Sequence, residues 1–159
     1  MKKMSKLVAL ALALVMALSL TVTAGAEETT TAQDMAGSIV ILHTNDVHGA
    51  IGGYAKVAAL KDSYEDRGAY VLLLDAGDFI QGDPTVSTSQ GATAVELMNL
   101  AGYDLAAPGN HEFDYGYPQL KENLSKADFA VLCANILKDG ENAFQGNTII
   151  EKDGVKIGF

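Results

Sequence analysis

Short hydrophobic runs alternate with segments of helical hydrophobic spacing from residue 38 onward. The runs that predict strands are 39–42, 70–74, 104–107 and 129–133. The segments that predict helices are 53–67, 93–101 and 119–126. Runs 148–151 and 155–159 flank Asp153-Gly154 and predict a β-hairpin. Because strands alternate with helices of about ten residues, we expect an α/β fold with a mostly parallel sheet and helices on both faces.

The N-terminal segment differs from the rest of the chain. Three lysines within residues 1–6 precede an apolar run at 7–20, and Ala24-Gly25-Ala26 offers a small-x-small cleavage pattern. This order predicts a signal peptide at 1–26, with an uncleaved membrane anchor as the alternative. Polar residues 27–37 predict a flexible lead-in. We therefore expect a secreted, periplasmic or cell-surface protein with no stable membrane span after cleavage.

The charge balance excludes one class of partner. The chain has 11 Lys and Arg against 20 Asp and Glu, and its formal net charge is −9. Nucleic-acid binding through a basic patch is therefore not expected. A lone Cys133 excludes an intramolecular disulfide framework and a thiolate zinc cluster, and we expect it to be a small core residue. An anionic substrate would need positive charge from a source other than Lys and Arg.

Polar side chains follow each of the first three predicted strands. These candidates are Asp46 and His48, then Asp75 and Asp78, then Asn110 and His111. The carboxyl ends of parallel strands meet at one edge of an open sheet, where ligands bind. The sequence therefore predicts that three loops bring acid, imidazole and amide groups to a common pocket.

This set of groups suits divalent cations. Asp46 and His48 can bind one ion, and oxygen with nitrogen ligands favours Zn²⁺, Mn²⁺ or Fe over Ca²⁺. The two carboxylate oxygens of Asp78 can bridge two ions, and the neutral amide of Asn110 can bind the second. We therefore predict two divalent metal ions, which would supply the positive charge that attracts a phosphate.

His111 and Asp114 suggest acid catalysis beside the metals. One helical turn would bring Asp114 next to the His111 ring, where a carboxylate favours the protonated imidazole. That imidazolium could stabilise a reacting phosphate and protonate the leaving alcohol. Asp114 has a second interpretation, as the N-cap of the segment that follows.

Other polar residues have structural interpretations. We expect Asp75 to cap a turn or support a ligand, and Glu112 to play a supporting or structural role. We expect His43 to be a packed, hydrogen-bonded histidine rather than a ligand. Asp83-Pro84 predicts a turn, followed by a mobile loop at 85–90.

Three motifs carry a family resemblance. Ile41-Leu-His-Thr-Asn-Asp-Val-His-Gly49, Asp75-Ala-Gly-Asp78 and Gly109-Asn-His-Glu-Phe-Asp114 resemble the calcineurin-like metallophosphoesterases. More narrowly, they resemble the secreted 5′-nucleotidase family, which includes UDP-sugar hydrolases and 2′,3′-cyclic-nucleotide phosphodiesterases. The resemblance covers residues 39–159 and implies the front part of a four-layer αββα domain. It implies Asp46 and His48 on one metal, Asp78 as a bridge, Asn110 on the other metal, and a His111–Asp114 catalytic dyad.

The resemblance also implies an activity. The expected reaction is hydrolysis of extracytoplasmic nucleotides by a hydroxide that two metals activate. The family's remaining ligands are histidines of later motifs, including Gly-His-x-His, and no histidine follows His111 here. We therefore expect residues 38–159 to be the N-terminal part of the domain, without the C-terminal nucleotide-binding domain and inactive alone.

Two alternatives remain open at this point. The same site could act on cyclic nucleotides, nucleotide sugars or a sulfur-carrier conjugate. The chain could instead be a non-catalytic metal-binding or ligand-binding remnant.

Overall fold

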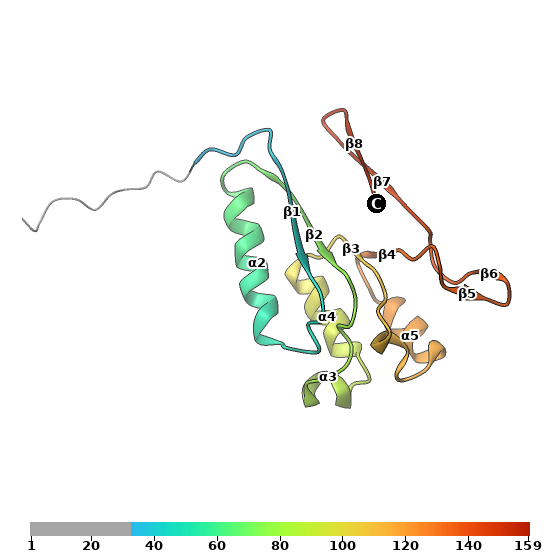
Figure 1. Ribbon diagram of the computed structural model, residues 1–159. Coiled ribbons are helices and arrows are strands. Elements are labelled where there is room, and N and C mark those ends of the chain that lie inside the picture. Colours follow the sequence, from blue (N-terminus) through green and yellow to red (C-terminus); the bar gives the residue numbers. More distant parts are fainter. Residues whose placement is uncertain (1–32) are drawn as a thin grey trace, which may run out of the picture. The chain divides into compact units, whose positions relative to one another are not determined.

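The computed structural model describes residues 33–159, which are coloured in Figure 1. The predicted signal peptide and most of the predicted lead-in lie outside the described residues. Residues Asp34–Phe159 form one compact unit, and that unit is described here by itself. Within the described part, no helix is long and apolar enough to cross a membrane.

A four-stranded parallel sheet forms the centre of this unit. Its strands are β1 (Ile39–Thr44), β2 (Tyr70–Asp75), β3 (Leu105–Ala106) and β4 (Ala130–Val131), in the order β1-β2-β3-β4. In the register, Thr44 lies opposite Asp75, and Asp75 lies opposite Ala106. The predicted parallel sheet is confirmed, and the ends of its first three strands lie level. The loops that follow these strands therefore leave from one edge.

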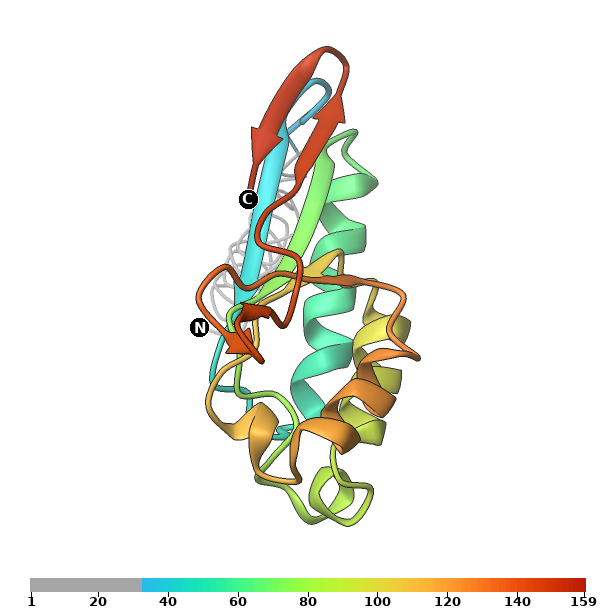
Figure 2. The same cartoon turned by 90° about the vertical axis from the view of Figure 1, so that its right-hand side faces the viewer.

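Three helices connect the strands and lie on one face of the sheet (Figure 2). They are α2 (Gly52–Glu65), α4 (Ala92–Ala101) and α5 (Tyr117–Leu124). The strand order in the sheet follows the chain order, so every crossover runs in the same direction across the sheet. Because such crossovers are right-handed, each places its helix on the same face. The expectation of helices on both faces therefore differs from what the described residues show.

The face of β1 opposite the helices carries exposed side chains. Ile41 is 48% exposed, and His43, two residues further along the strand, is exposed as well. Side chains alternate along a strand, so Ile41 and His43 share a face while Leu42 packs against the core. The prediction that His43 is packed and hydrogen-bonded is wrong for this reason.

The hydrophobic core lies between the sheet and the helices. It includes Leu73 of β2, Met98 of α4 and Phe79 of the loop after β2, each with at most 1% of its surface exposed. The predicted helix at 93–101 is confirmed as α4, and its residues Ala94, Met98 and Ala101 are buried. In α2, by contrast, Tyr54 is the buried residue, and Leu60 is 44% exposed.

A short helix replaces the mobile loop that was predicted at 85–90. Helix α3 spans Pro84–Thr88. The Asp83 side chain accepts a hydrogen bond from the backbone N–H of Thr85 at 2.8 Å, and Pro84 occupies the first turn. Asp-Pro therefore acts as an N-cap followed by a proline that is already in helical geometry. The prediction took Asp83-Pro84 for a turn and did not recognise the start of a helix.

Two hairpins follow the sheet. The predicted one is confirmed as β7 (Ile149–Lys152) and β8 (Val155–Gly158), joined by a left-handed Asp153-Gly154 turn. The other, β5 (Leu137–Lys138) with β6 (Glu141–Asn142), was not predicted, although Asp139-Gly140 carries the same signal.

Cys133 follows β4 in the segment that leads to these hairpins. It is half-buried, and its thiol donates to Oδ1 of Asn135 at 3.0 Å. The prediction of a core cysteine is therefore wrong: β4 ends at Val131, and Cys133 beyond it is only half-buried.

Candidate metal centre

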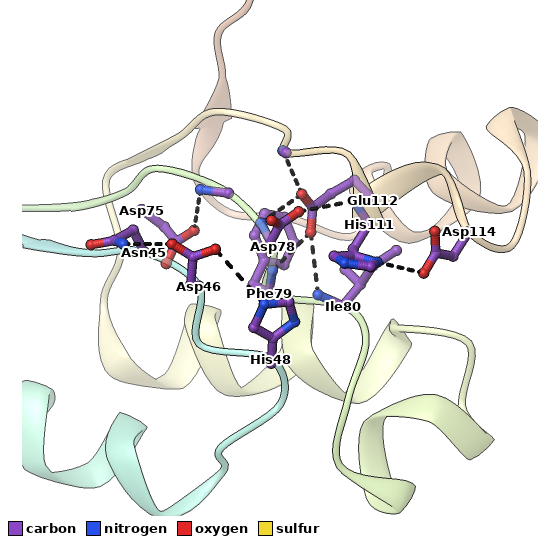
Figure 3. A network of polar contacts seen from close by, with 12 residues as sticks. Asn45, Asp46, His48, Asp75, Asp78, Phe79, Ile80, His111, Glu112 and Asp114 are labelled. Atoms are coloured by element: carbon purple, nitrogen blue, oxygen red, sulfur yellow. Dashed lines mark hydrogen bonds and ion pairs between the residues drawn. The ribbon is translucent and has the colours of Figure 1, made fainter.

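Three loops at the carboxyl edge of the sheet bring their polar side chains together (Figure 3). They follow β1, β2 and β3, and the last contains the 3-10 helix η1 (His111–Phe113). His48, Asp78 and His111 each offer a ligand atom, and these atoms all lie within 4.8 Å of one another. The His48 and His111 rings meet edge to face, with their centroids 5.1 Å apart. The predicted convergence of the three loops is therefore observed.

Asp46 lies at the margin of this group, and Asn110 directly precedes its third member, His111. Oδ1 of Asp46 is 3.7 Å from Nε2 of His48, and Oδ2 accepts a hydrogen bond from the Asn45 amide at 2.7 Å. Asn110 is exposed at the start of η1, and its side chain forms no capping hydrogen bond there. Both residues are accessible to a cation, and their roles as ligands remain predictions.

Three of the four predicted metal ligands have a left-handed backbone. The φ angles of Asp46, His48 and Asp78 are +50°, +46° and +63°. This conformation costs a residue with a β-carbon about 1–3 kcal/mol and persists only where the surroundings impose it. Here the backbone N–H of Asp46 donates to the Gly77 carbonyl at 3.0 Å, and that of His48 donates to the Asp78 carbonyl at 2.9 Å. The loop after β1 is thus held against the loop after β2.

Close glycine contacts hold the loop after β2 against the loop after β3. A β-carbon on Gly77 would lie 2.8 Å from the Gly109 Cα, and one on Gly109 would lie 2.7 Å from Cγ of Asp78. No larger residue fits either position without a shift of the backbone or of the Asp78 carboxylate. The glycines of the second and third motifs therefore allow the two loops to approach this closely.

Asp75 supports the site from behind. It is 3% exposed, and it accepts hydrogen bonds from the backbone N–H of Gly77 at 2.8 Å and from the Thr44 hydroxyl at 2.5 Å. Thr44 is also hydrogen-bonded to the Tyr103 hydroxyl at 2.8 Å. Burial raises the pKa of Asp75 to about 6, although the bonds from Thr44 and Gly77 oppose the rise. These contacts support the predicted turn-capping role.

Glu112 is the most deeply enclosed polar residue of the site. None of its surface is exposed, and its carboxylate accepts hydrogen bonds from four backbone N–H groups of the loops after β2 and β3. The sequence predicted only a supporting or structural role. The position of this glutamate directly after His111 was the available signal, but three of its four partners lie more than 30 residues earlier, in the loop after β2.

His111 and Asp114 form the predicted pair. Nδ1 of His111 lies 2.7 Å from Oδ2 of Asp114, and this hydrogen bond raises the pKa of the His111 imidazole. Helix α5 takes Gly116 as its N-cap, so the alternative role of Asp114 as a helix cap does not hold. The pair is thus arranged to hold a proton on the imidazole beside His48 and Asp78.

The donor set fits a divalent cation. Two imidazoles and a carboxylate converge, and the carboxylate of Asp46 lies beside them. Among residues 33–159, no Lys or Arg forms an ion pair or a hydrogen bond with any of these four side chains. Mixed nitrogen and oxygen ligands with excess negative charge favour Zn²⁺, Mn²⁺ or Fe²⁺.

Known proteins are similar to this chain in sequence and in fold. The chain is 35% identical to a 5′-nucleotidase of Vibrio vulnificus over 139 residues and 35% identical to Protein UshA of Escherichia coli over 147 residues. These matches cover 79% and 83% of this chain but only 25% and 27% of the relatives. A 5′-nucleotidase precursor structure from Thermus thermophilus superposes with a TM-score of 0.67 at 30% identity, over 74% of this chain and 27% of that chain.

The chain thus spans about a quarter of the length of these relatives. The family described as calcineurin-like phosphoesterase matches residues 39–158, which include the whole sheet and all three site loops. That match covers most of the chain, and the α/β fold agrees with it. The chain belongs to the calcineurin-like phosphoesterase family.

Proposed function

We propose that these residues form the N-terminal part of the active site of a metal-dependent phosphoesterase that hydrolyses nucleotides outside the cytoplasm. The observation that carries the proposal is the convergence of His48, Asp78 and His111, whose ring is hydrogen-bonded to Asp114. Relatives named 5′-nucleotidase support a nucleotide phosphate as the substrate. The predicted signal peptide supports an extracytoplasmic location.

In this proposal, four side chains would hold two divalent cations. Asp46 and His48 would hold one ion, Asn110 would hold the other, and Asp78 would contact both. Asp78 suits a bridge because its Oδ1 already faces the His111 loop, accepting a hydrogen bond from the His111 backbone N–H at 2.9 Å. When bound, such ions polarise the phosphoryl group and lower the pKa of a water molecule.

The side chains beside the metal ligands handle the proton. His111, kept protonated by Asp114, donates a hydrogen bond to the phosphate and then protonates the leaving alcohol oxygen. Asp114 accepts the hydrogen bond from Nδ1 of His111 throughout and so orients the ring, which leaves Nε2 of His111 to face the substrate. The surrounding carboxylates repel an anion unless cations are present, so substrate binding and metal binding are expected to be coupled.

The test is nucleotide hydrolysis by the full-length gene product that carries this sequence, with Mn²⁺ or Zn²⁺ added. We expect nucleoside monophosphate hydrolysis that chelation abolishes. We expect Asp78→Asn to lose metal and activity together, by about 10-fold or more, because the bridge loses its charge. Asp62→Asn on the exposed side of α2 is the matched control and is expected to retain both.

Two results would contradict the proposal. One is an Asp78→Asn variant that retains its metals and its activity. The other is phosphate-ester hydrolysis that persists unchanged after complete removal of metal.

A further inference from the structure

Glu112 is a buried carboxylate to which the proposed reaction assigns no role. We infer that Glu112 is a positioning residue, which fixes the loops of Asp78 and His111 to one another and thereby sets the geometry of the metal site. The inference rests on the proposed function, because the consequence for metal binding follows from the roles given there to Asp78 and its neighbours. Its structural part rests on hydrogen bonds that exist without metal.

The two oxygens of Glu112 have different partners. Oε1 accepts from the backbone N–H groups of Phe79 at 2.8 Å and Ile80 at 3.2 Å, which both lie in the loop after β2. Oε2 accepts from Asp78 at 2.8 Å and from Gly109 at 2.5 Å, so it joins the loop after β2 to the loop after β3. An ionised carboxylate can accept all four bonds, because it carries about four lone-pair sites and no proton (Figure 3).

A second hydrogen bond between the same loops completes a closed arrangement. The backbone N–H of Asp78 donates to Glu112, while Oδ1 of Asp78 accepts from the backbone N–H of His111 at 2.9 Å. Glu112 and His111 are sequence neighbours, so Asp78 is held at its backbone and at its carboxylate by adjacent residues. A displacement of the Glu112 carboxylate would therefore move the proposed bridging ligand relative to the proposed acid.

The burial of Glu112 explains why its four hydrogen bonds, called here the Glu112 lock, couple the folding of the two loops. A carboxylate removed from water is costly unless hydrogen bonds or charges compensate it. In the described residues, no Lys, Arg or His lies within ion-pair distance of Glu112, and backbone N–H groups supply its recorded partners. Those groups converge only when both loops take the observed conformation. Formation of one loop thus favours formation of the other.

Glu112→Gln tests the inference with little change in shape. The substitution replaces one oxygen by an NH₂ group, so one pair of backbone N–H groups then faces a donor. We expect Mn²⁺ affinity, measured by titration calorimetry on the chain, to fall by about 10- to 100-fold. We also expect the amide protons of Asp78 and Gly109 in the metal-free chain to exchange on the order of tenfold faster.

Asn123→Leu is the matched control. Asn123 is also completely buried, and its side-chain amide donates to the Gln90 carbonyl at 2.7 Å, in the turn between α3 and α4. This variant loses a buried polar contact of similar kind, but it leaves the bonds between the site loops intact. We expect a lower melting temperature, unchanged Mn²⁺ affinity and unchanged exchange at Asp78 and Gly109.

The outcomes separate the inference from the proposed function. Wild-type Mn²⁺ affinity in a folded Glu112→Gln variant would overturn the inference, as would an equal loss of affinity in Asn123→Leu at a matched loss of stability. If Glu112→Gln does not fold, the wild-type exchange rates decide, and unprotected amides at Asp78 and Gly109 would overturn the lock. A wild-type chain with protected amides but no Mn²⁺ binding would keep the lock and contradict the proposed function.

Discussion

The backbone N–H of His111 donates a hydrogen bond to Oδ1 of Asp78 at 2.9 Å. This contact joins the proposed bridging ligand to the loop that carries the proposed acid, across a sequence separation of 33 residues. The Asp78 carboxylate therefore has one oxygen oriented by the protein before any cation binds. Such pre-organisation lowers the cost of assembling a metal site, because the ligand does not have to be ordered when the ion arrives.

Replacement of His111 separates acid catalysis from metal ligation. In the full-length gene product, we expect His111→Ala to lower kcat by about 10²- to 10⁴-fold, because the leaving alcohol loses its proton donor. Metal content, measured by plasma emission spectrometry, is expected to be retained. Loss of both metals in this variant would instead make His111 a ligand, a role that its distance from His48 and Asp78 also permits.

Asp114→Asn tests the source of the raised His111 pKa. The hydrogen bond from the imidazole to Asp114 is the largest cause of that rise, so the variant is expected to show a lower pKa. Because the folded-state pKa of this histidine is raised, its stabilising contribution is present below about pH 6.5 and is lost as the pH rises through the folded value. Proton NMR titration of the metal-free chain measures the His111 pKa in the wild type and in Asp114→Asn. An unchanged His111 pKa would contradict this account of the pair.

Asp75→Asn is expected to stabilise the metal-free chain at neutral pH. The folded-state pKa of about 6 lies above the ordinary value of 3.8, so stability falls as the pH rises between these values and the loss persists above them. Asparagine can accept from Gly77 and donate to the Thr44 hydroxyl, without the buried charge. Relative to wild type, we expect a gain of up to about 3 kcal/mol at pH 7.5 and little gain at pH 4. Equal gains at both pH values in chemical denaturation would refute the pKa assignment.

Gly109→Ala tests the close contact between the second and third site loops. A β-carbon there would lie 2.7 Å from Cγ of Asp78, so the carboxylate must move. We expect a loss of about 1–3 kcal/mol in stability and weaker Mn²⁺ binding. Gly53→Ala in α2 is the control, because its β-carbon meets open space and alanine favours a helix by up to about 1 kcal/mol. Equal Mn²⁺ affinity in both variants would argue against this role of Gly109.

Much of the fold follows from local patterns in the sequence. Strand β2 is a continuous apolar run, and α4 presents Ala94, Met98 and Ala101 at helical spacing before a glycine stop. Each of the first three strands is followed by a polar motif. This was enough to predict which loops meet, because the carboxyl ends of parallel strands lie at one edge of the sheet. These features depend on short-range spacing, so one sequence is sufficient to show them.

Other features depend on contacts that spacing does not encode. The left-handed backbone at Asp46 and His48 is held by hydrogen bonds that their N–H groups donate to carbonyls of the loop after β2, about 30 residues away. The burial of Glu112 similarly depends on the loop after β2, which lies more than 30 residues earlier. His43 was assigned to a packed position because its strand reads as apolar, yet the described residues leave its face uncovered.

Anomalous X-ray diffraction from crystals grown with Mn²⁺ tests the central claim most directly. The account predicts a manganese peak between the three loops, within direct coordination distance of an imidazole nitrogen of His48 and a carboxylate oxygen of Asp78. Asp46 is expected in the same coordination shell. A peak elsewhere on the chain, or an empty centre in crystals that are saturated with Mn²⁺, would contradict it.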